Sequence, residues 1–116
     1  MCGILGKIYF DQSRVIDKNL IRDMNNTMTH RGPDDEGYYV ERNVALAHRR
    51  LSIIDLESGH QPIYNEDRSI IMVCNGEIYN YKALRSELIE AGHTFKSNTD
   101  VEVIVHMYEE MGLGFA

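Results

Sequence analysis

The chain has 116 residues, of which 43% are hydrophobic and 26% charged, a composition typical of one globular domain. Its net charge of -6, with lysines and arginines scattered along the sequence, argues against a nucleic-acid-binding surface. The two cysteines lie far apart and no histidines stand at metal-ligand spacing, so we expect neither a disulfide framework nor a metal site. Because no stretch resembles a signal peptide or reaches membrane-spanning length, we expect a cytoplasmic protein.

The first half of the chain predicts a strand, a helix and a pair of strands. Residues 3–10 form a short apolar run that indicates a buried strand with Cys2 at its head. Asp17 is a favourable N-cap for a helix that carries apolar residues at helical spacing until residues 30–33, where glycine and proline stop it. Residues 37–40 and 44–54 then predict paired strands joined through residues 41–43.

The second half predicts one strand and two helices. Residues 70–74 indicate a buried strand that ends at Asn75-Gly76, a dipeptide suited to positive φ. Asn80 can cap the next helix. Thr99 and Glu102 form a capping-box pattern ahead of an amphipathic stripe between residues 101 and 108. Together the predicted elements favour an α+β fold.

Cys2 stands where removal of Met1 would leave a thiol and a free α-amine on one residue. An α-amine titrates at about 7.7–8.0, so part of it is neutral near pH 7 and can accept a proton from the thiol. This arrangement predicts a self-contained nucleophile and base. The alternative is that Cys2, like Cys74 in its predicted strand, is a small apolar residue without a chemical role.

Polar groups at three other positions allow either a role in catalysis or binding, or a purely structural role. Asn75-Gly76 offers a carboxamide N–H and an unobstructed backbone N–H, the ingredients of an oxyanion hole, but it also suits a hairpin turn. Arg50 lies in an apolar run, where its planar fork suits a carboxylate, although it could equally point into water from an edge strand. Asp100 fits an anion-favouring first helical turn or a ligand contact. Each histidine is interpreted as structural: His30, His48, His60, His93 and His106.

Several motifs together resemble the family of glutamine-hydrolysing asparagine synthetases. They occur in the family's order and nearly from end to end of the chain: Met1-Cys2-Gly3-Ile4, His30-Arg31-Gly32-Pro33-Asp34, Arg50-Leu51-Ser52-Ile53-Ile54-Asp55, Gln61-Pro62, Asn75-Gly76-Glu77-Ile78-Tyr79-Asn80 and Ser97-Asn98-Thr99-Asp100-Val101-Glu102. Other class II amidotransferase families, which act on sugars or phosphoribosylamine precursors, share the terminal cysteine but match these motifs less closely.

The resemblance implies a catalytic role for Cys2 and a substrate role for Arg50. Cys2 would attack the side-chain amide of glutamine to form a thioester, with its own amine as proton carrier, and water would release glutamate. Arg50 would hold the α-carboxylate of glutamine. The remaining implied contacts are the pocket-lining backbone of Leu51, Ser52, Ile53 and Ile54, the oxyanion hole of Asn75 and Gly76, and the ammonium-binding carboxylates of Glu77 and Asp100.

The resemblance also implies an N-terminal-nucleophile α/β/β/α sandwich of antiparallel sheets, incomplete at the C-terminus of residues 1–116. A synthetase domain, absent here, would bind ATP and Mg²⁺ and use the ammonia to convert aspartate to asparagine; no cofactor is expected in this chain. Glutamine and that linked domain are the expected partners, and a homodimer stays open. Two alternatives remain: a catalytically silent glutamine-binding or interaction fragment, and an amidotransferase for a non-aspartate acceptor.

Overall fold

The computed structural model describes residues 1–52 and 59–116, which form two compact units. The first unit contains residues 1–62 and 73–75, and the second contains residues 63–72 and 76–116. Each unit combines helical segments with antiparallel strands, which confirms the predicted α+β class. Within the described ranges, no helix is long and apolar enough to cross a membrane.

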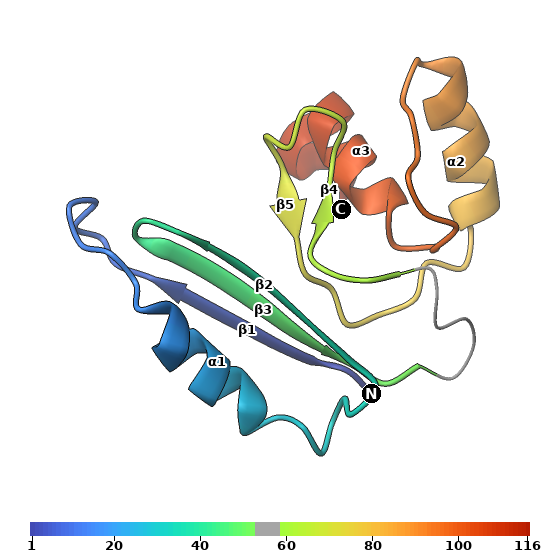
Figure 1. Cartoon of the computed structure of the whole chain (residues 1–116). Helices are drawn as coiled ribbons and strands as arrows, with labels where there is room; N and C mark the ends of the chain where they lie inside the picture. The colour runs from blue at the N-terminus through green and yellow to red at the C-terminus, as the bar shows by residue number, and fades with distance from the viewer. Residues whose placement is uncertain (53–58) are drawn as a thin grey trace. The chain divides into compact units, whose positions relative to one another are not determined.

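The first unit is built on a three-stranded antiparallel sheet of order β1-β3-β2 (Figure 1). Its strands are β1 (Gly3–Ile8), β2 (Asp35–Glu41) and β3 (Val44–Arg50). The predicted hairpin between β2 and β3 is confirmed, with Arg42 at φ 50° in its turn. The start of β1, the start of β2 and the end of β3 meet at one end of the sheet, where Gly3 pairs with Arg49 and Asp35 with Arg50.

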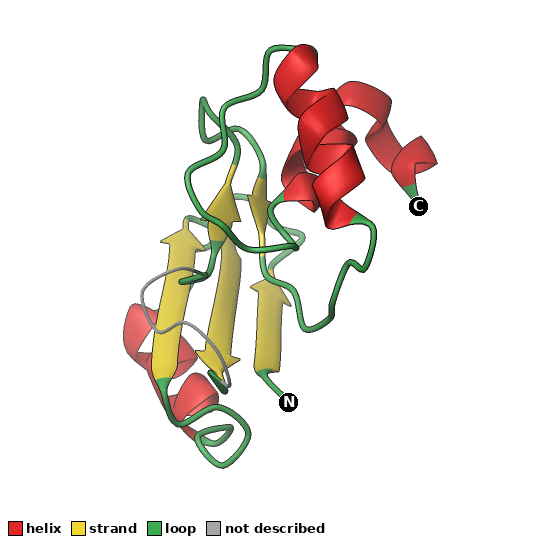
Figure 2. Cartoon of the chain, turned by 90° about the vertical axis from the view of Figure 1, so that its right-hand side faces the viewer, coloured by secondary structure: helices red, strands yellow, loops and turns green. Residues whose placement is uncertain are grey.

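Helix α1 (Lys18–Asn26) covers one face of this sheet (Figures 1 and 2). Asp17 caps it as predicted, because its carboxylate accepts a hydrogen bond of 2.8 Å from the Asn19 amide. The helix ends at Asn26, earlier than the sequence predicts. The Thr27 hydroxyl bonds back to the Met24 carbonyl at 2.7 Å, and the chain continues in turns instead of helix. The core beneath the helix is formed by Ile16, Ile21, Ala45 and Ala47.

The other side of the sheet, here called the second face, is the side that α1 does not cover. Ile4 and Ile8 of β1 lie on it and are 51% and 57% exposed. The predicted first strand is thus confirmed over Gly3–Ile8, but it is not buried on this face. Side chains alternate between the two faces of a strand, and Leu5 and the following Tyr9 pack on the α1 side, against the core cluster.

The second unit pairs two short antiparallel strands, β4 (Ile63–Tyr64) and β5 (Ile71–Met72), and contains three helical segments. These segments are α2 (Tyr81–Glu90), α3 (Val103–Met111) and the 3₁₀ helix η1 (Gly112–Phe115). Strand β5 is shorter than the predicted strand over residues 70–74 and only half-buried. Its ladder ends at Met72, because β4 offers only two residues for pairing.

Helix α3 does not begin with the predicted capping box. It starts at Val103, and Glu102 makes no side-chain cap bond. The Glu102 carboxylate is buried and instead accepts hydrogen bonds of 2.7 Å from each of the amides of Lys96 and Ser97. The amides of Lys96 and Ser97 have no partner in a strand ladder, so they bond the carboxylate that the capping box would have used.

Candidate functional site

Cys2 and Arg50 lie at the same end and on the same face of the three-stranded sheet. Gly3 of β1 is paired with Arg49 of β3, so the preceding Cys2 stands at the level of Arg50. Paired residues share a face and neighbours alternate, so the side chain of Arg50 lies on the second face, and extending the β1 register by one residue puts Cys2 on the same face. The fold therefore brings together the predicted nucleophile and the predicted carboxylate anchor, which are far apart in the sequence.

Arg49 and its neighbour Arg50 lie on opposite faces of β3. The Arg49 side chain is buried on the α1 side, where Nε donates to the Asn25 carbonyl at 3.3 Å and the guanidinium bonds the Asn26 side chain. It also pairs with Glu36 of β2 at 2.8 Å. A buried guanidinium needs such partners to offset its lost hydration. Arg49 is thus structural, and alternation leaves Arg50 facing the other way.

The loop over residues 30–34 holds the chain segment that follows Arg50. A side chain on Gly32 would place its Cβ 2.4 Å from the Arg49 carbonyl carbon, so this close crossing requires glycine. Beyond it, the Asp34 amide donates to the Arg50 carbonyl at 3.0 Å, and the Asp34 carboxylate accepts from the Ser52 amide at 2.8 Å. Leu51 is exposed and Ser52 half-buried, whereas the predicted pocket residues Ile53 and Ile54 lie outside the described residues.

Gln61 fixes the backbone that leads to Asn75. Its side-chain amide accepts from the Cys74 N–H at 2.7 Å and donates to the Cys74 carbonyl at 3.0 Å, as a paired strand would. The Gln61 backbone in turn lies directly on β2, where a Cβ on Gly37 would stand 1.5 Å from the Gln61 carbonyl oxygen. Gly37 pairs with His48 on the second face. The segment ending in Asn75 is therefore anchored to the face that carries Cys2 and Arg50.

His48 is the buried titratable group of this region. Burial lowers its pKa below the ordinary value, against the opposing effects of the Cys74 carbonyl and the Asp35 carboxylate, which favour the protonated ring. Arg50 adds to the lowering because its positive charge disfavours a second one nearby. Asp35 also contacts the exposed His60, with 2.7 Å between Oδ2 and Nδ1. At neutral pH, burial therefore keeps His48 uncharged beneath the candidate site.

Asn75-Gly76 is not a hairpin turn. The dipeptide leads from β5 towards α2, and neither residue has the positive φ that a two-residue hairpin loop of this type requires. Both residues are exposed, with a bend at Gly76. The hairpin alternative is thus wrong, and the exposed amide groups stay available for the oxyanion interpretation.

Asp100 lies ahead of α3 and not in its first turn, which corrects the helix-dipole interpretation. Its carboxylate instead accepts a hydrogen bond of 2.6 Å from the Ile78 amide. This contact ties Asp100 to the residue that follows Glu77. Gly76, Glu77 and Asp100, all of which were predicted to contact the substrate, belong to the second unit.

Sequence reasoning missed the positioning residues of the site. Asp34 and Gln61 were part of the quoted motifs but had no predicted role. In the structure the Asp34 side chain bonds the Ser52 amide, and the Gln61 side chain bonds the Cys74 amide. Their position in loop segments could have indicated this role, because a polar side chain there can replace a missing backbone hydrogen bond. His93 and His106 were interpreted as isolated, yet the fold of the second unit brings their rings to 4.9 Å between centroids.

Comparison with known proteins decides the family. Residues 1–116 match the family described as "Glutamine amidotransferase domain". The chain belongs to this family. It is 48% identical over 117 aligned positions to asparagine synthetase [glutamine-hydrolyzing] 2 of Bacillus subtilis (strain 168), with 99% of this chain and 15% of the relative covered.

Two plant relatives are similar to this chain to a comparable degree and are likewise covered only in part. Asparagine synthetase [glutamine-hydrolyzing] of Sandersonia aurantiaca is 45% identical, with 99% of this chain and 22% of the relative covered. Asparagine synthetase [glutamine-hydrolyzing] 3 of Arabidopsis thaliana is 44% identical, with 99% and 20% covered. The chain thus spans about a fifth or less of the length of these relatives, 15–22%. The resemblance to glutamine-hydrolysing asparagine synthetases is confirmed over the whole chain.

Proposed function

We propose that this chain is the N-terminal part of a glutaminase that hydrolyses glutamine to glutamate and ammonia. The observation that carries the proposal is the placement of Cys2 and Arg50 at one end and on one face of the sheet. Such a pair can act on the two ends of one amino acid. The nucleophile meets the side-chain amide, and the guanidinium fork binds the α-carboxylate with two parallel hydrogen bonds.

The reaction follows from the groups on Cys2 once Met1 is removed. The α-amine takes the thiol proton, and the sulfur attacks the amide carbon of glutamine to give a tetrahedral oxyanion. The carbon–nitrogen bond breaks as the α-ammonium returns the proton to the departing ammonia, leaving a thioester. Water, deprotonated by the same amine, then attacks the thioester and releases glutamate. Cys2 is thus both nucleophile and proton carrier in the first step; in the second step water is the nucleophile, the Cys2 sulfur is the leaving group, and the α-ammonium returns the proton to that sulfur.

The other predicted residues serve charge and orientation in this proposal. The Asn75 carboxamide and the Gly76 N–H donate to the oxyanion, which forms only during attack, so they stabilise the transition state more than the bound substrate. Glu77 and Asp100 receive the substrate ammonium, with Asp100 held by the Ile78 amide. Opposite charges at the substrate's α-carbon and donors at its amide would together select a zwitterion with an amide side chain.

The exposed β1 side of the second face supports a further part of the proposal, an N-terminal-nucleophile sandwich. Ile4 and Ile8 expose apolar surface there, as expected of a layer that packs against another sheet. In a longer protein the ammonia would serve an ATP- and Mg²⁺-dependent synthetase domain that makes asparagine from aspartate. The names of the relatives support this acceptor chemistry. The hydrolysis of glutamine by Cys2 needs none of those groups.

The proposal is tested by trapping the thioester position with an electrophilic glutamine analogue. Mass spectrometry should show a chain without Met1 and one label on Cys2. Cys2→Ala should abolish labelling and ammonia release, because the sulfur forms the covalent bond. Cys74→Ala is the matched control, since it removes the other thiol and should keep both. A retained Met1 with no labelling would favour a silent glutamine-binding module, and labelling in Cys2→Ala would show that the nucleophile is misassigned.

A further inference from the structure

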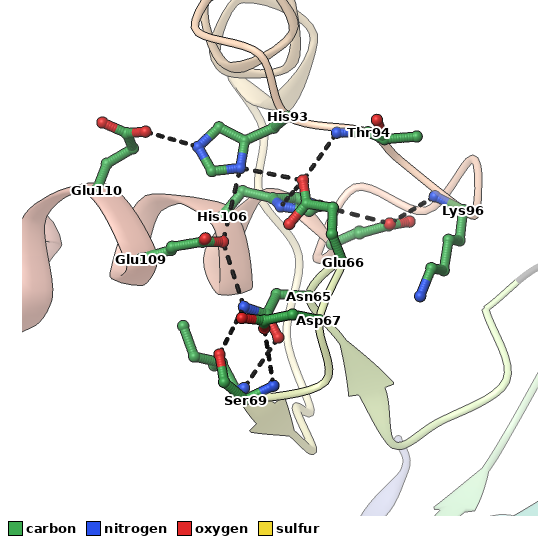
Figure 3. A network of polar contacts seen from close by, with 12 residues as sticks. Asn65, Glu66, Asp67, Ser69, His93, Thr94, Lys96, His106, Glu109 and Glu110 are labelled. Atoms are coloured by element: carbon green, nitrogen blue, oxygen red, sulfur yellow. Dashed lines mark hydrogen bonds and ion pairs between the residues drawn. The ribbon is translucent and has the colours of Figure 1, made fainter.

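The second unit contains a cluster of four metal-ligating side chains, shown in Figure 3 and here called the His-Glu cluster. It consists of Glu66, the second residue after β4, His93 after α2, and His106 and Glu109 of α3. One ligand atom from each side chain lies within 4.8 Å of the others. None of these residues has a part in the proposed hydrolysis of glutamine.

The contact distances match the edges of a small metal polyhedron. Nitrogen and oxygen ligands bind Zn²⁺ at about 2.0–2.2 Å, so neighbouring ligands at the corners of a tetrahedron stand about 3.3–3.6 Å apart. His93 Nδ1 lies 3.2 Å from Glu66 Oε1 and 3.7 Å from Glu109 Oε2. His106 Nδ1 lies 3.3 Å from the same Glu66 oxygen. These three separations, 3.2–3.7 Å, are close to the length that a tetrahedral site requires.

Both imidazoles are oriented as metal-bound histidines usually are. His93 Nε2 lies 2.7 Å from Glu110 Oε1, and His106 Nε2 lies 3.6 Å from Glu102 Oε1. A ring proton on Nε2 towards these carboxylates leaves the Nδ1 lone pair of each ring directed into the cluster. The Glu110 carboxylate, bonded to His93, fixes the tautomer of that ring and strengthens the ligand, whereas the Glu102 carboxylate faces His106 Nε2 at a distance too long for a hydrogen bond.

The ligand carboxylates are also held in place. The Thr94 amide donates to Glu66 Oε1 at 2.8 Å, and Asn65 Nδ2 donates to Glu109 Oε2 at 3.3 Å. Such contacts reduce the conformational freedom that a flexible glutamate would lose on binding an ion. The cluster is therefore preorganised on both its nitrogen and its oxygen side.

His106 gives an independent indication of a ligand. Its side chain is 0% exposed, and among the described residues neither ring nitrogen has a hydrogen bond of acceptable geometry. A buried polar group without a partner costs free energy that a bound ion would offset. The Nδ1 lone pairs of the two histidines also face glutamate oxygens, which repels unless a cation or an additional proton lies between them.

We propose that the His-Glu cluster is a binding site for one divalent transition-metal ion, best fitted by Zn²⁺, with His93 Nδ1, His106 Nδ1, Glu66 and Glu109 as ligands. Two imidazoles favour zinc over the hard cations Mg²⁺ and Ca²⁺, which prefer oxygen ligands. The side chains of Glu66 and Glu109 are 32% and 39% exposed, which leaves an entry path from solvent. Metal binding would join the β4 region, the α2 end and α3 in one fixed arrangement.

The test measures metal binding by the metal-stripped chain with Zn²⁺ and Co²⁺ themselves. Zn²⁺ affinity is read by competition with a chromophoric chelator, and bound Co²⁺ is read by its visible absorption. We expect one ion per chain and the intense visible bands of tetrahedral Co²⁺. Sulfur-to-cobalt absorption should be absent, because the ligands are nitrogen and oxygen. A thiolate band would assign the ion to Cys2 or Cys74 and overturn the proposal.

Variants separate a metal site from a network of protonated histidines. Glu109→Gln keeps the side-chain size at a partly exposed position, so it should stay folded and weaken Zn²⁺ binding by at least about tenfold. His93→Gln should do the same. Glu90→Gln, which removes an equal charge from the end of α2 in the same unit, is the matched control and should bind as the parent does.

Stability gives a second measurement. At the same Zn²⁺ concentration the melting temperature of the parent chain and of Glu90→Gln should rise more than that of Glu109→Gln, because the stabilisation grows with the affinity of the folded state for the ion. The proposal is wrong if neither Zn²⁺ nor Co²⁺ binds saturably below about 1 mM. It is equally wrong if Glu109→Gln and Glu90→Gln bind alike. Either result would show that protons on the histidines, and not a metal ion, hold the cluster together.

Discussion

Gly37 tests whether the contact between β2 and the Gln61 backbone positions the candidate site. In Gly37→Ala the new Cβ would stand 1.5 Å from the Gln61 carbonyl oxygen, 2.7 Å from its carbon and 3.1 Å from Pro62 Cδ. Carbonyl contacts closer than about 3 Å are not tolerated, and backbone atoms cannot rotate away as a flexible side chain can. The Gln61 segment must therefore move by roughly 1.5 Å, the difference between the two distances.

The expected cost follows from the contacts that such a movement breaks. Overpacking costs about 1–3 kcal/mol, and the two hydrogen bonds between Gln61 and Cys74 contribute about 1 kcal/mol each. We expect Gly37→Ala to lower the free energy of unfolding by about 3–5 kcal/mol, a large part of the stability of a small domain. Asn75 follows Cys74, so glutamine hydrolysis should fall as well.

The assay is equilibrium unfolding by denaturant, with Gly6→Ala as the matched control. Gly6 lies in β1 of the same sheet, but its added Cβ would meet Leu46 Cδ2 at an ordinary 3.6 Å. Gly6→Ala should change the free energy of unfolding by less than about 1 kcal/mol. If Gly37→Ala were as stable as Gly6→Ala, the Gln61 segment would not rest on β2 and the positioning argument would fail.

Three further predictions concern Arg50, Asn75 and His48. Arg50→Lys loses the bidentate fork and should raise the KM for glutamine by the equivalent of about 1–3 kcal/mol, whereas an unchanged KM would place Arg50 outside the substrate site. Asn75→Ala should lower kcat by about 10²–10³ with little change in KM, and the opposite pattern would make Asn75 a substrate anchor. Burial lowers the His48 pKa, so below about pH 6.5 the unfolded chain binds more protons than the folded chain. The free energy of unfolding should therefore decrease as the pH is lowered. His48→Gln should reduce that loss in unfolding experiments between about pH 8 and about pH 5, and an unchanged pH slope would contradict it.

The sequence was sufficient for elements whose signals are local. The Asp17 cap and the hairpin around residues 41–43 were predicted because caps and turns depend on a few neighbouring residues. Helix α2 also begins after Asn80 as predicted, but the Asn80 side chain makes no cap hydrogen bond. The motifs around Cys2 and Arg50 likewise indicated the amidotransferase family, which the comparison confirms. The roles of the site residues stay predictions, to be tested by the variants above.

Only the tertiary structure decided what depends on partners distant in the sequence. The Thr99–Glu102 pattern satisfied a local rule, yet Glu102 bonds the 96–97 loop, because a buried carboxylate is taken by whichever donors the fold brings to it. Strand register put Cys2 and Arg50 on one face, and packing turned Arg49 to the other. His93 and His106 are not at a spacing typical of metal ligands within one helix or strand, because His93 follows α2 and His106 lies in α3. They meet Glu66 and Glu109 only when α3 packs beside the α2 end, a contact that no window of sequence contains.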